Sequence, residues 1–299
     1  MLYVNPGYVE LLNGVYTGST ILNSETLYFT NTNRTTNIKF DSVKELWIKG
    51  KFTVGSSVIR FYIIDESVTV GFRTDSSSDN VLTGYIIPFN NVSNSTAIIP
   101  TFGKLIVSHE YDFLMHVKSD DTTGEIEIYL NNVLQYSYSG DKMKGLTFSS
   151  FTIVSVDSDT YFRDIIIADF DITDYYIAPC TIKSYDSDFE KQTDGTLKAT
   201  ATGQLLSSVI DSDALKASML EKVDNPEIVG VNVSAFNVNY DSSVVNTLKS
   251  SIDGADSETL TIKNNNVAGN ILLTNPALSK AWTLDQLKTA AFKLTADKV

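Results

Sequence analysis

The sequence predicts an all-β protein of two β-sandwich, jelly-roll-like domains with one or two short helices. Runs of β-branched and aromatic residues recur at short intervals, with turn-forming clusters between them. Helical signals are confined to two short segments, residues 212–220 and 284–290. The chain has 299 residues, of which 42% are hydrophobic. That length allows one large domain or two ordinary domains, each with its own core.

The first domain is predicted from strand and turn patterns. Residues 1–24 give mixed signals, so we expect loop and one short edge strand there. Residues 45–52 and 57–64 are rich in β-branched and aromatic side chains and predict two strands. Residues 74–80 and 90–94 are dominated by Ser, Asn, Asp and Thr, which predicts two loops.

A β-hairpin is the clearest single element. Residues 124–130 and 133–138 both alternate, and only Asn131-Asn132 separates them. Asparagine tolerates positive φ, so a two-residue type I′ turn fits this spacing. Residues 160–171 predict one long strand or two joined strands. Strands at this spacing favour a sandwich or jelly roll.

The sequence changes character after residue 177. Residues 178–200 are polar and turn-rich, so we divide the chain into domains 1–177 and 178–299. Beyond them, residues 212–220 predict a short helix with Ser212 or Asp213 as its N-cap.

Residues 228–240 predict a strand whose apolar phase slips by one residue. Val229, Val231 and Val233 lie in one phase, whereas Phe236 and Val238 lie in the other. Strand side chains repeat every two residues, so we expect a β-bulge near Ala235.

The end of the chain predicts a capped helix near residues 284–290, followed by a last strand. Thr283 fits an N-cap, and Gln286 three residues later completes a capping box. Trp282 and Leu287 occupy the positions of a hydrophobic staple. We expect this short helix to close one open end of the second sandwich.

Composition excludes several classes of function. The net charge of −13 disfavours binding to nucleic acid or to anionic membrane surfaces. No apolar run reaches the length of a membrane span, and the first residues do not resemble a signal peptide. Cys180 is the only cysteine, and we interpret it as a small buried hydrophobe.

Four Asn-x-Ser/Thr sequons occur, which an Asn-, Ser- and Thr-rich chain produces by chance. They begin at Asn33, Asn91, Asn94 and Asn232.

Residues that could carry chemistry are few. His109 and His116 are the two histidines, and on one strand their spacing would place them on opposite faces. Glu125 and Glu127 share a strand face, with carboxylates about 6–7 Å apart. Retaining glycosidases hold two carboxyl groups about 5–5.5 Å apart. Some sandwich-fold glucanases use such a pair with a third acid, for which the sequence gives no candidate, so we interpret both glutamates as solvated.

Two other groups have structural interpretations with functional alternatives. Asp-Ser-Asp triplets begin at Asp157, Asp186 and Asp211, and we interpret them as turn or cap residues, with calcium binding as the alternative. Tyrosines are plentiful. We expect them to pack in the core or at sheet edges, with sugar stacking or a protein interface as the alternative. The main ones are Tyr136, Tyr138, Tyr175 and Tyr176. We predict no catalytic residue, cofactor or resident metal.

The second domain resembles the C-terminal part of a family of structural proteins of tailed bacteriophages. That family has a "v-G-v-q-v-x-a-r" strand and later a "D/N-P-x-T-x-x-x-W-T" segment that leads into a short helix and a final strand. The matching residues here are 229–235 and 275–283, and the resemblance covers residues 226–296. Leu278 stands where Thr is common.

The first domain is similar to the laminin-G/concanavalin-like jelly roll that often precedes it in such proteins. The resemblance lies in residues 124–140 and 156–167, with Asn131-Asn132 in place of an Asp-Gly-like turn.

These resemblances imply a non-enzymatic virion protein of the tail or an external decoration. It would be assembled in the bacterial cytoplasm and present in symmetric copies beside other virion proteins. Weak binding to host-surface glycans would aid adsorption through multivalency. The alternative is a secreted or surface carbohydrate-binding module, either lectin-like or a glycoside hydrolase.

Overall fold

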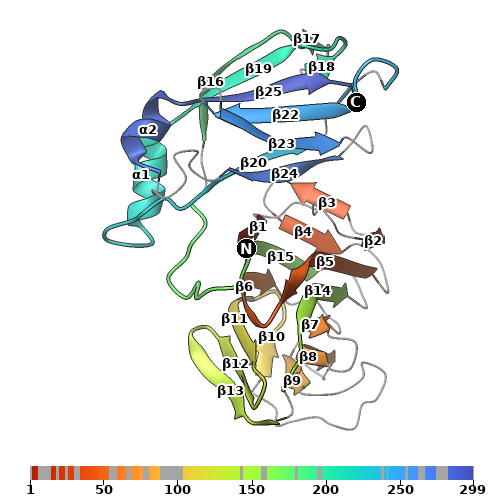
Figure 1. The fold of residues 1–299 in the computed structure, drawn as a ribbon, viewed down its shortest axis with the longest axis vertical. Helices are drawn as coiled ribbons and strands as arrows, with labels where there is room; N and C mark the ends of the chain where they lie inside the picture. Colours follow the sequence, from red (N-terminus) through yellow and green to blue (C-terminus); the bar gives the residue numbers. More distant parts are fainter. Residues whose placement is uncertain are drawn as a thin grey trace. The chain divides into compact units, whose positions relative to one another are not determined.

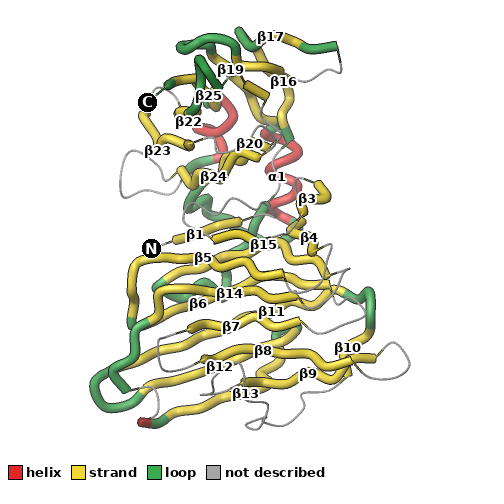
Figure 2. The backbone as a smooth tube through the Cα atoms, turned by 90° about the vertical axis from the view of Figure 1, so that its right-hand side faces the viewer, coloured by secondary structure: helices red, strands yellow, loops and turns green. Residues whose placement is uncertain are grey.

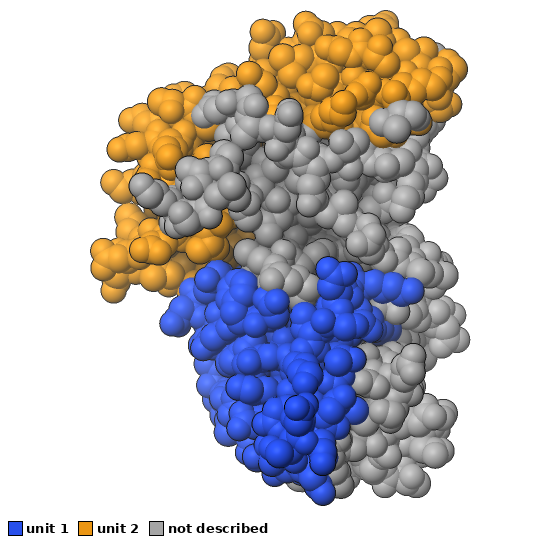
Figure 3. Space-filling view, in the orientation of Figure 1, with its two compact units in different colours: residues 1–175 blue, residues 176–299 orange. Residues whose placement is uncertain are grey.

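The described residues of this computed structural model form two compact units, residues 1–175 and 176–299 (Figure 3). The sequence-based boundary at 177/178 falls two residues later. The structure describes residues 2–5, 15–17, 20–23, 26–29, 34–53, 59–64, 69–76, 81–87, 104–141, 144–155, 160–178, 181–193, 197–236, 239–240, 242–252, 255–261, 267–273 and 282–298.

Unit 1 contains an eight-stranded sheet in which every pair of neighbours is antiparallel (Figure 1). In spatial order its strands are β13 (Val133–Ser139), β12 (Gly124–Leu130), β11 (Glu110–Ser119), β6 (Glu45–Thr53), β15 (Thr160–Ala168), β4 (Thr26–Phe29) and β3 (Thr20–Asn23), with β1 (Leu2–Asn5) also paired to β15.

A seven-stranded antiparallel sheet forms the second layer of unit 1, and Figure 2 shows its strands running beside those of the first. Its order is β10 (Lys104–Ile106), β9 (Val81–Ile87), β8 (Thr69–Ser76), β7 (Ile59–Ile64), β14 (Phe148–Ser155), β5 (Arg34–Val43) and β2 (Val15–Thr17).

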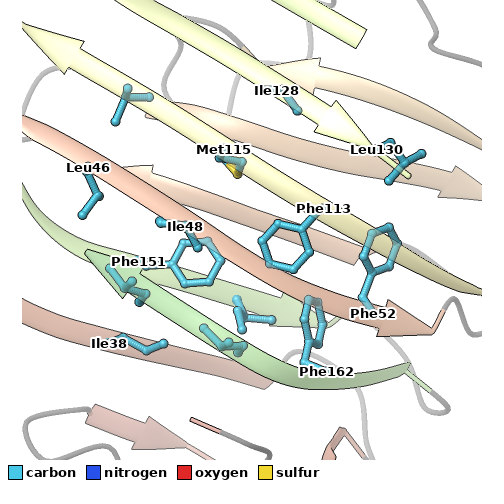
Figure 4. Close-up of a cluster of buried hydrophobic side chains, with 14 of the residues drawn as sticks. Ile38, Leu46, Ile48, Phe52, Phe113, Met115, Ile128, Leu130, Phe151 and Phe162 are labelled. Carbon is cyan, nitrogen blue, oxygen red and sulfur yellow. The ribbon is translucent and has the colours of Figure 1, made fainter. Parts of the chain in front are cut away.

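The core of unit 1 lies between these two sheets. Along β6 every second residue is buried, as the period of two in a strand requires. The ring of Phe113 lies 6.1 Å from that of Phe52 within the eight-stranded sheet and 6.4 Å from that of Phe151 on β14. Figure 4 shows these rings among the buried aliphatic side chains. Phe113 therefore joins the two layers of the sandwich.

The predicted hairpin is confirmed. Strands β12 and β13 pair across a two-residue connection, and Asn131 and Asn132 have φ angles of 49° and 62°. Positive φ at both positions is what a type I′ turn requires. The side chain of Asn131 also accepts a hydrogen bond of 2.9 Å from the backbone N–H of Asp112, which fixes the turn against β11.

Unit 2 is built on a five-stranded antiparallel sheet with two smaller sheets beside it. The order of the larger sheet is β16 (Ile182–Ser187), β19 (Leu205–Ile210), β25 (Ala291–Asp297), β22 (Thr247–Ile252) and β23 (Ala255–Thr261). The three-stranded sheet contains β17 (Glu190–Lys191), β18 (Leu197–Ala199) and β21 (Asn239–Tyr240), and β20 (Val231–Phe236) pairs with β24 (Val267–Leu273).

Two helices, α1 (Ser212–Leu220) and α2 (Leu284–Thr289), lie side by side at one end of unit 2 (Figure 1). Their buried residues belong to the same cluster as Trp282 and Phe292, so both helices complete the core. The all-β class with two short helices is therefore confirmed.

The sequence predicted an N-cap for each of the two helices, and the structure tests both predictions. The predicted capping box is present: Thr283 Oγ1 accepts a hydrogen bond from the backbone N–H of Gln286, and the Gln286 side chain accepts one from that of Thr283. For α1 the prediction was wrong by one residue, because Asp211 is the N-cap and accepts bonds from two backbone N–H groups of the first turn. The bond geometry, which composition does not reveal, selects among three adjacent cap-forming residues.

Strands form in the regions where they were predicted, but several begin or end at other residues. Strand β8 continues to Ser76, inside the predicted loop 74–80, because it pairs with β9 there. The strand predicted over 160–171 ends at Ala168. Three strands form within the turn-rich residues 178–200. In each case pairing with a neighbouring strand overrides local composition.

The register of β20 shifts between Ser234 and Phe236, which confirms the bulge predicted near Ala235. The predicted loop at 90–94 lies outside the described residues, as do residues 57–58 and 77–80.

A substitution at Gly50 on β6 would test how tightly the core is packed. A Cβ atom at this position would lie 2.8 Å from Cε1 of Phe113. We expect Gly50→Ala to lower the free energy of unfolding by about 1–3 kcal/mol because overpacking displaces that ring. Urea denaturation measures this effect, with Ser137→Ala on exposed β13 as the control. Equal stability of the two variants would contradict the packing argument.

The capping box of α2 makes a second prediction. Thr283→Ala removes the side-chain oxygen that accepts from Gln286. We expect a loss of about 1 kcal/mol in the stability of unit 2, the usual effect of deleting an N-cap. Thermal unfolding followed by far-ultraviolet circular dichroism measures it. Thr283→Ser keeps the acceptor oxygen and should retain most of the stability.

Candidate functional site

The outer face of the eight-stranded sheet, opposite the core, carries a group of aromatic, acidic and basic side chains. Along β6 the side chains that alternate with the core are those of Glu45, Trp47, Lys49 and Lys51, and all are half-buried. Alternation sends neighbouring residues to opposite faces, so the strand that builds the core also builds this surface.

Strand register places His116 of β11 at the centre of the face. His116 lies opposite Trp47 on β6 and opposite Glu127 on β12. Directly paired residues share a sheet face, so three neighbouring strands each bring one side chain to this point. The side chain of His116 is 8% exposed.

A network of hydrogen bonds and ring contacts holds this histidine. Its Nε2 lies 3.0 Å from Oε1 of Glu45, and its Nδ1 lies 3.7 Å from Oε2 of Glu127. An ionised carboxylate only accepts, so Nε2 carries a proton. The imidazole stacks on the indole of Trp47 with ring centroids 3.8 Å apart. We name Glu45, Trp47, His116 and Glu127 the imidazole cluster.

Two further polar groups surround the imidazole cluster. The hydroxyl of Tyr129 donates to Oε2 of Glu127 over 3.2 Å, and Nε1 of Trp47 donates to Oε1 of Glu45 over 3.3 Å. The Lys118 ammonium lies 3.7 Å from Oε2 of Glu45. The polar ends of both aromatic rings are thus fixed by carboxylates, so the rings are held in set orientations.

The electrostatics of Glu45 follow from these partners. Burial disfavours its charged form, but hydrogen bonds from His116 and Trp47 and attraction to Lys118 and His116 together outweigh burial. The pKa of Glu45 therefore lies below its usual value.

A second ionic group lies along the same face. Arg163 of β15 makes two hydrogen bonds of 2.7 Å to the carboxylate of Glu110, from Nε and from Nη2. Lys51 lies within 3.7 Å of Glu110 and 3.4 Å of Asp112. Hydrogen bonding by Arg163 exceeds the effect of burial and lowers the pKa of Glu110.

The segment after β15 contacts this face through Lys49 and acts on His116 through its charge. Nζ of Lys49 donates to the carbonyl oxygen of Thr173 over 2.7 Å. Asp171 accepts hydrogen bonds from the backbone N–H and the hydroxyl of Thr173, which lower the pKa of Asp171, and His116 adds a weaker attraction. Asp171 thus adds a third carboxylate to those whose field acts on His116.

The structure corrects two sequence interpretations at this site. Glu125 is exposed as predicted, but Glu127 is half-buried and bound to its neighbours, while Ile126 and Ile128 point into the core. An acid that the sequence analysis did not single out, Glu45, is distant in sequence and is brought to this face by pairing of β6 with β11. No local pattern could have indicated it, because long-range register decides the contact.

His109 lies one residue before β11, so the two histidines do not share a strand and the condition under which they would take opposite faces of it is not met. His109 precedes β11, where its backbone N–H donates to the carbonyl of Ile106 and its ring contacts the edge of Tyr111 at 5.1 Å. The chain turns at Ser108, which has a φ of 64°. Only His116 belongs to the outer face.

The other residues singled out from sequence are dispersed. Asp211 caps α1, and the carboxylate of Asp186 accepts from the backbone N–H of Ser187. Tyr136 and Tyr138 pack against the core of unit 1, which confirms their structural interpretation. Tyr175 is half-buried beside Phe170, whereas Tyr176 is half exposed.

Some predicted residues lie outside the described part of the chain: Asp157, Cys180, Asn33, Asn91 and Asn94. Asn232 lies on β20. Within the described ranges, no group of three or more His, Cys, Asp or Glu side chains could hold a metal ion. In the same residues no helix is long and apolar enough to cross a membrane.

Comparison with known proteins gives remote structural similarities. No protein-family profile matches the chain, and no curated protein matches it. The chain is similar to a sialidase at 12% identity and a TM-score of 0.40, over 62% of this chain and 18% of that protein. It therefore spans less than a fifth of the sialidase's length.

Two further solved structures are similar over most of their own length. One is an endo-β-1,4-glucuronan lyase from Trichoderma reesei, at 10% identity and a TM-score of 0.37, over 56% of this chain and 95% of that protein. The other is a legume lectin-like domain from Entamoeba histolytica, at 9% identity and a TM-score of 0.38. That similarity covers 54% of this chain and 91% of that protein.

The lowered pKa of Glu45 predicts a pH-dependent contribution to stability. A depressed folded-state pKa stabilises the fold above the unfolded value of about 4.3, and this contribution is lost as pH falls through the folded pKa. We expect Glu45→Gln to cost about 1 kcal/mol at pH 7, as for a partly exposed hydrogen-bonded charge. The difference from the parent should shrink below about pH 4.

Urea denaturation at pH 7 and at about pH 3 measures this dependence. Asp121→Asn is the control, because it breaks only the exposed ion pair with Lys44 and should change stability little at either pH. If Glu45→Gln lowered the free energy of unfolding equally at both pH values, the lowered pKa of Glu45 would be refuted.

Proposed function

We propose that the chain is a non-enzymatic glycan-binding protein whose binding surface is the outer face of the eight-stranded sheet. The observation that carries this proposal is the imidazole cluster with Tyr129 and Lys118 beside it. Aromatic rings with fixed polar ends, set among carboxylates on rigid strands, offer both the apolar contact and the hydrogen bonds that sugar rings require.

The position of the cluster suits recognition without rearrangement. Each of its members stands on a central strand of the sheet, between paired neighbours, and its rotamer is held by hydrogen bonds or stacking. Such preorganisation lowers the entropy lost when a ligand binds. Within the described residues, Oε1 of Glu127 has no hydrogen-bond partner, and Glu125 is exposed beside it. These groups remain able to accept from sugar hydroxyls.

Charge balance on the face favours an uncharged sugar. Lys118 is close to Glu45, Lys51 lies between Glu110 and Asp112, and Arg163 binds Glu110. Cations neutralised in this way have little attraction left for carboxylated or sulfated glycans. We therefore expect neutral polysaccharide segments as ligands.

The same contacts support a binding role over hydrolysis. A general acid in a glycosidase needs a raised pKa, whereas that of Glu45 is lowered. The imidazole of His116 lies between the carboxylates of Glu45 and Glu127, where a scissile bond would have to fit. Both carboxylates act here as positioning groups for the aromatic rings.

The biological setting that we propose is the virion of a tailed bacteriophage, on the tail or as an external decoration. This part of the proposal rests on the sequence resemblance of residues 226–296. Many symmetric copies would convert weak single contacts with host glycans into avidity. Mass spectrometry of purified virions tests the setting, and the absence of peptides from this chain would rule it out.

A glycan array with the full-length chain tests the binding proposal. We expect saturable binding of neutral glycans, weakened by about tenfold in Tyr129→Ala, because an aromatic contact is lost. Lys44→Ala is the matched control, since that lysine forms an exposed ion pair with Asp121, a residue of the turn that precedes β12. Equal loss in both variants, or no binding by the parent protein, would defeat the proposal.

Hydrolysis is tested separately with the same glycans. We expect no release of reducing sugar by the parent protein. If release were observed and Glu127→Gln abolished it while leaving binding intact, the chain would be a glycoside hydrolase, and the non-enzymatic part of the proposal would be wrong.

A further inference from the structure

Unit 2 has an open, mainly apolar pocket with a volume of about 400 Å³. It lies between the last turns of α1, the segment around Ile228 and the start of α2. The residues that line it are Lys216, Met219, Leu220, Pro226, Glu227, Ile228, Trp282, Thr283 and Leu284. A volume of this size accommodates a large side chain or a small ligand.

The walls of the pocket are held in place by specific backbone contacts. Trp282 is 6% exposed and forms an isolated antiparallel bridge with Ile228, with its backbone N–H donating to the Ile228 carbonyl over 2.6 Å. Asp211 caps α1, and the capping box of Thr283 fixes the start of α2. The pocket is therefore preformed, so binding there would need little ordering of the wall.

Apolar side chains are also exposed at the rim of the pocket and on the segments next to its lining residues. Leu220 at its rim is 48% exposed, and Val223 and Val229, next to the lining segments in sequence, are 36% and 42% exposed. Exposed apolar side chains gathered around a pocket are typical of protein-binding surfaces, where one anchor enters the pocket and the rim excludes water. A small molecule would fill the pocket and leave this rim in water.

The charge around the pocket indicates the chemistry of the partner. The lining holds one cation and one carboxylate, Lys216 and Glu227, and the adjoining segment 221–227 contains three carboxylates and one lysine. An acidic surround attracts a basic segment. It disfavours a second copy of this chain, because two such surfaces would face each other with like charge, and it disfavours an anionic membrane for the same reason.

We propose that this pocket docks a peptide segment of a partner protein, in which one large apolar or aromatic side chain is flanked by lysine or arginine. The anchor contacts Met219, Ile228 and Leu220, and the basic neighbours pair with the carboxylates of the 221–227 segment. The interaction is independent of glycan binding by unit 1, since it uses residues of unit 2 alone.

Selection from a random peptide library on the immobilised full-length chain tests this proposal. Enriched peptides are resynthesised with a fluorescent label, and their affinities are measured by fluorescence anisotropy. We expect a shared apolar residue beside Lys or Arg, and binding weakened by about tenfold in Leu220→Glu and in Glu227→Lys. Raised salt should weaken binding as well.

Two matched variants on unit 1 serve as controls. Val133→Glu places a charge on an apolar side chain that is 59% exposed, and Asp121→Lys reverses an exposed carboxylate. Both should bind the selected peptides as the parent does. The proposal is overturned if no peptide is enriched, if the enriched peptides are acidic, or if the unit 2 variants bind as well as the unit 1 variants.

Discussion

The strict alternation of side chains along two neighbouring strands, β6 and β11, governs the structure of unit 1. Their inward side chains supply Phe52 and Phe113, and the contact of Phe113 with Phe151 joins the two sheets. Their outward side chains supply Trp47 and His116, which stack on the opposite face. Core and candidate site thus share two strands, and the packing of one face fixes the register of the other.

Because the imidazole cluster stands on the strands that also build the core, its side chains are held more rigidly than most surface side chains. Exposed ion pairs on flexible side chains contribute little, because ordering them costs entropy. Here His116 stands between strands that pair along their length, and both its ring nitrogens face carboxylates. The resulting surface is preorganised, and its cations lie beside carboxylates, which is the basis of the proposed binding of neutral sugars.

The core of unit 2 is built differently. Two short helices, α1 and α2, cover part of its largest sheet. Its five-stranded sheet packs against α1 and α2, and side-chain caps by Asp211 and Thr283 set where each helix begins. Thr283, the cap of α2, also lines the apolar pocket beside Trp282. Under the two proposals made above, one chain would bind a glycan through unit 1 and a partner protein through unit 2.

The sequence by itself determined the features that depend on neighbours in the chain: the all-β class, the turn at Asn131 and Asn132, the bulge near Ala235 and the capping box at Thr283. Each follows from backbone preferences or local hydrogen bonds that a few adjacent residues specify. Tertiary structure alone decided how far the strands extend and which acid meets His116. Glu45 reaches that imidazole through the register of β6 against β11. Neither segment's own sequence indicates which distant strand it pairs with, so this contact could not be predicted.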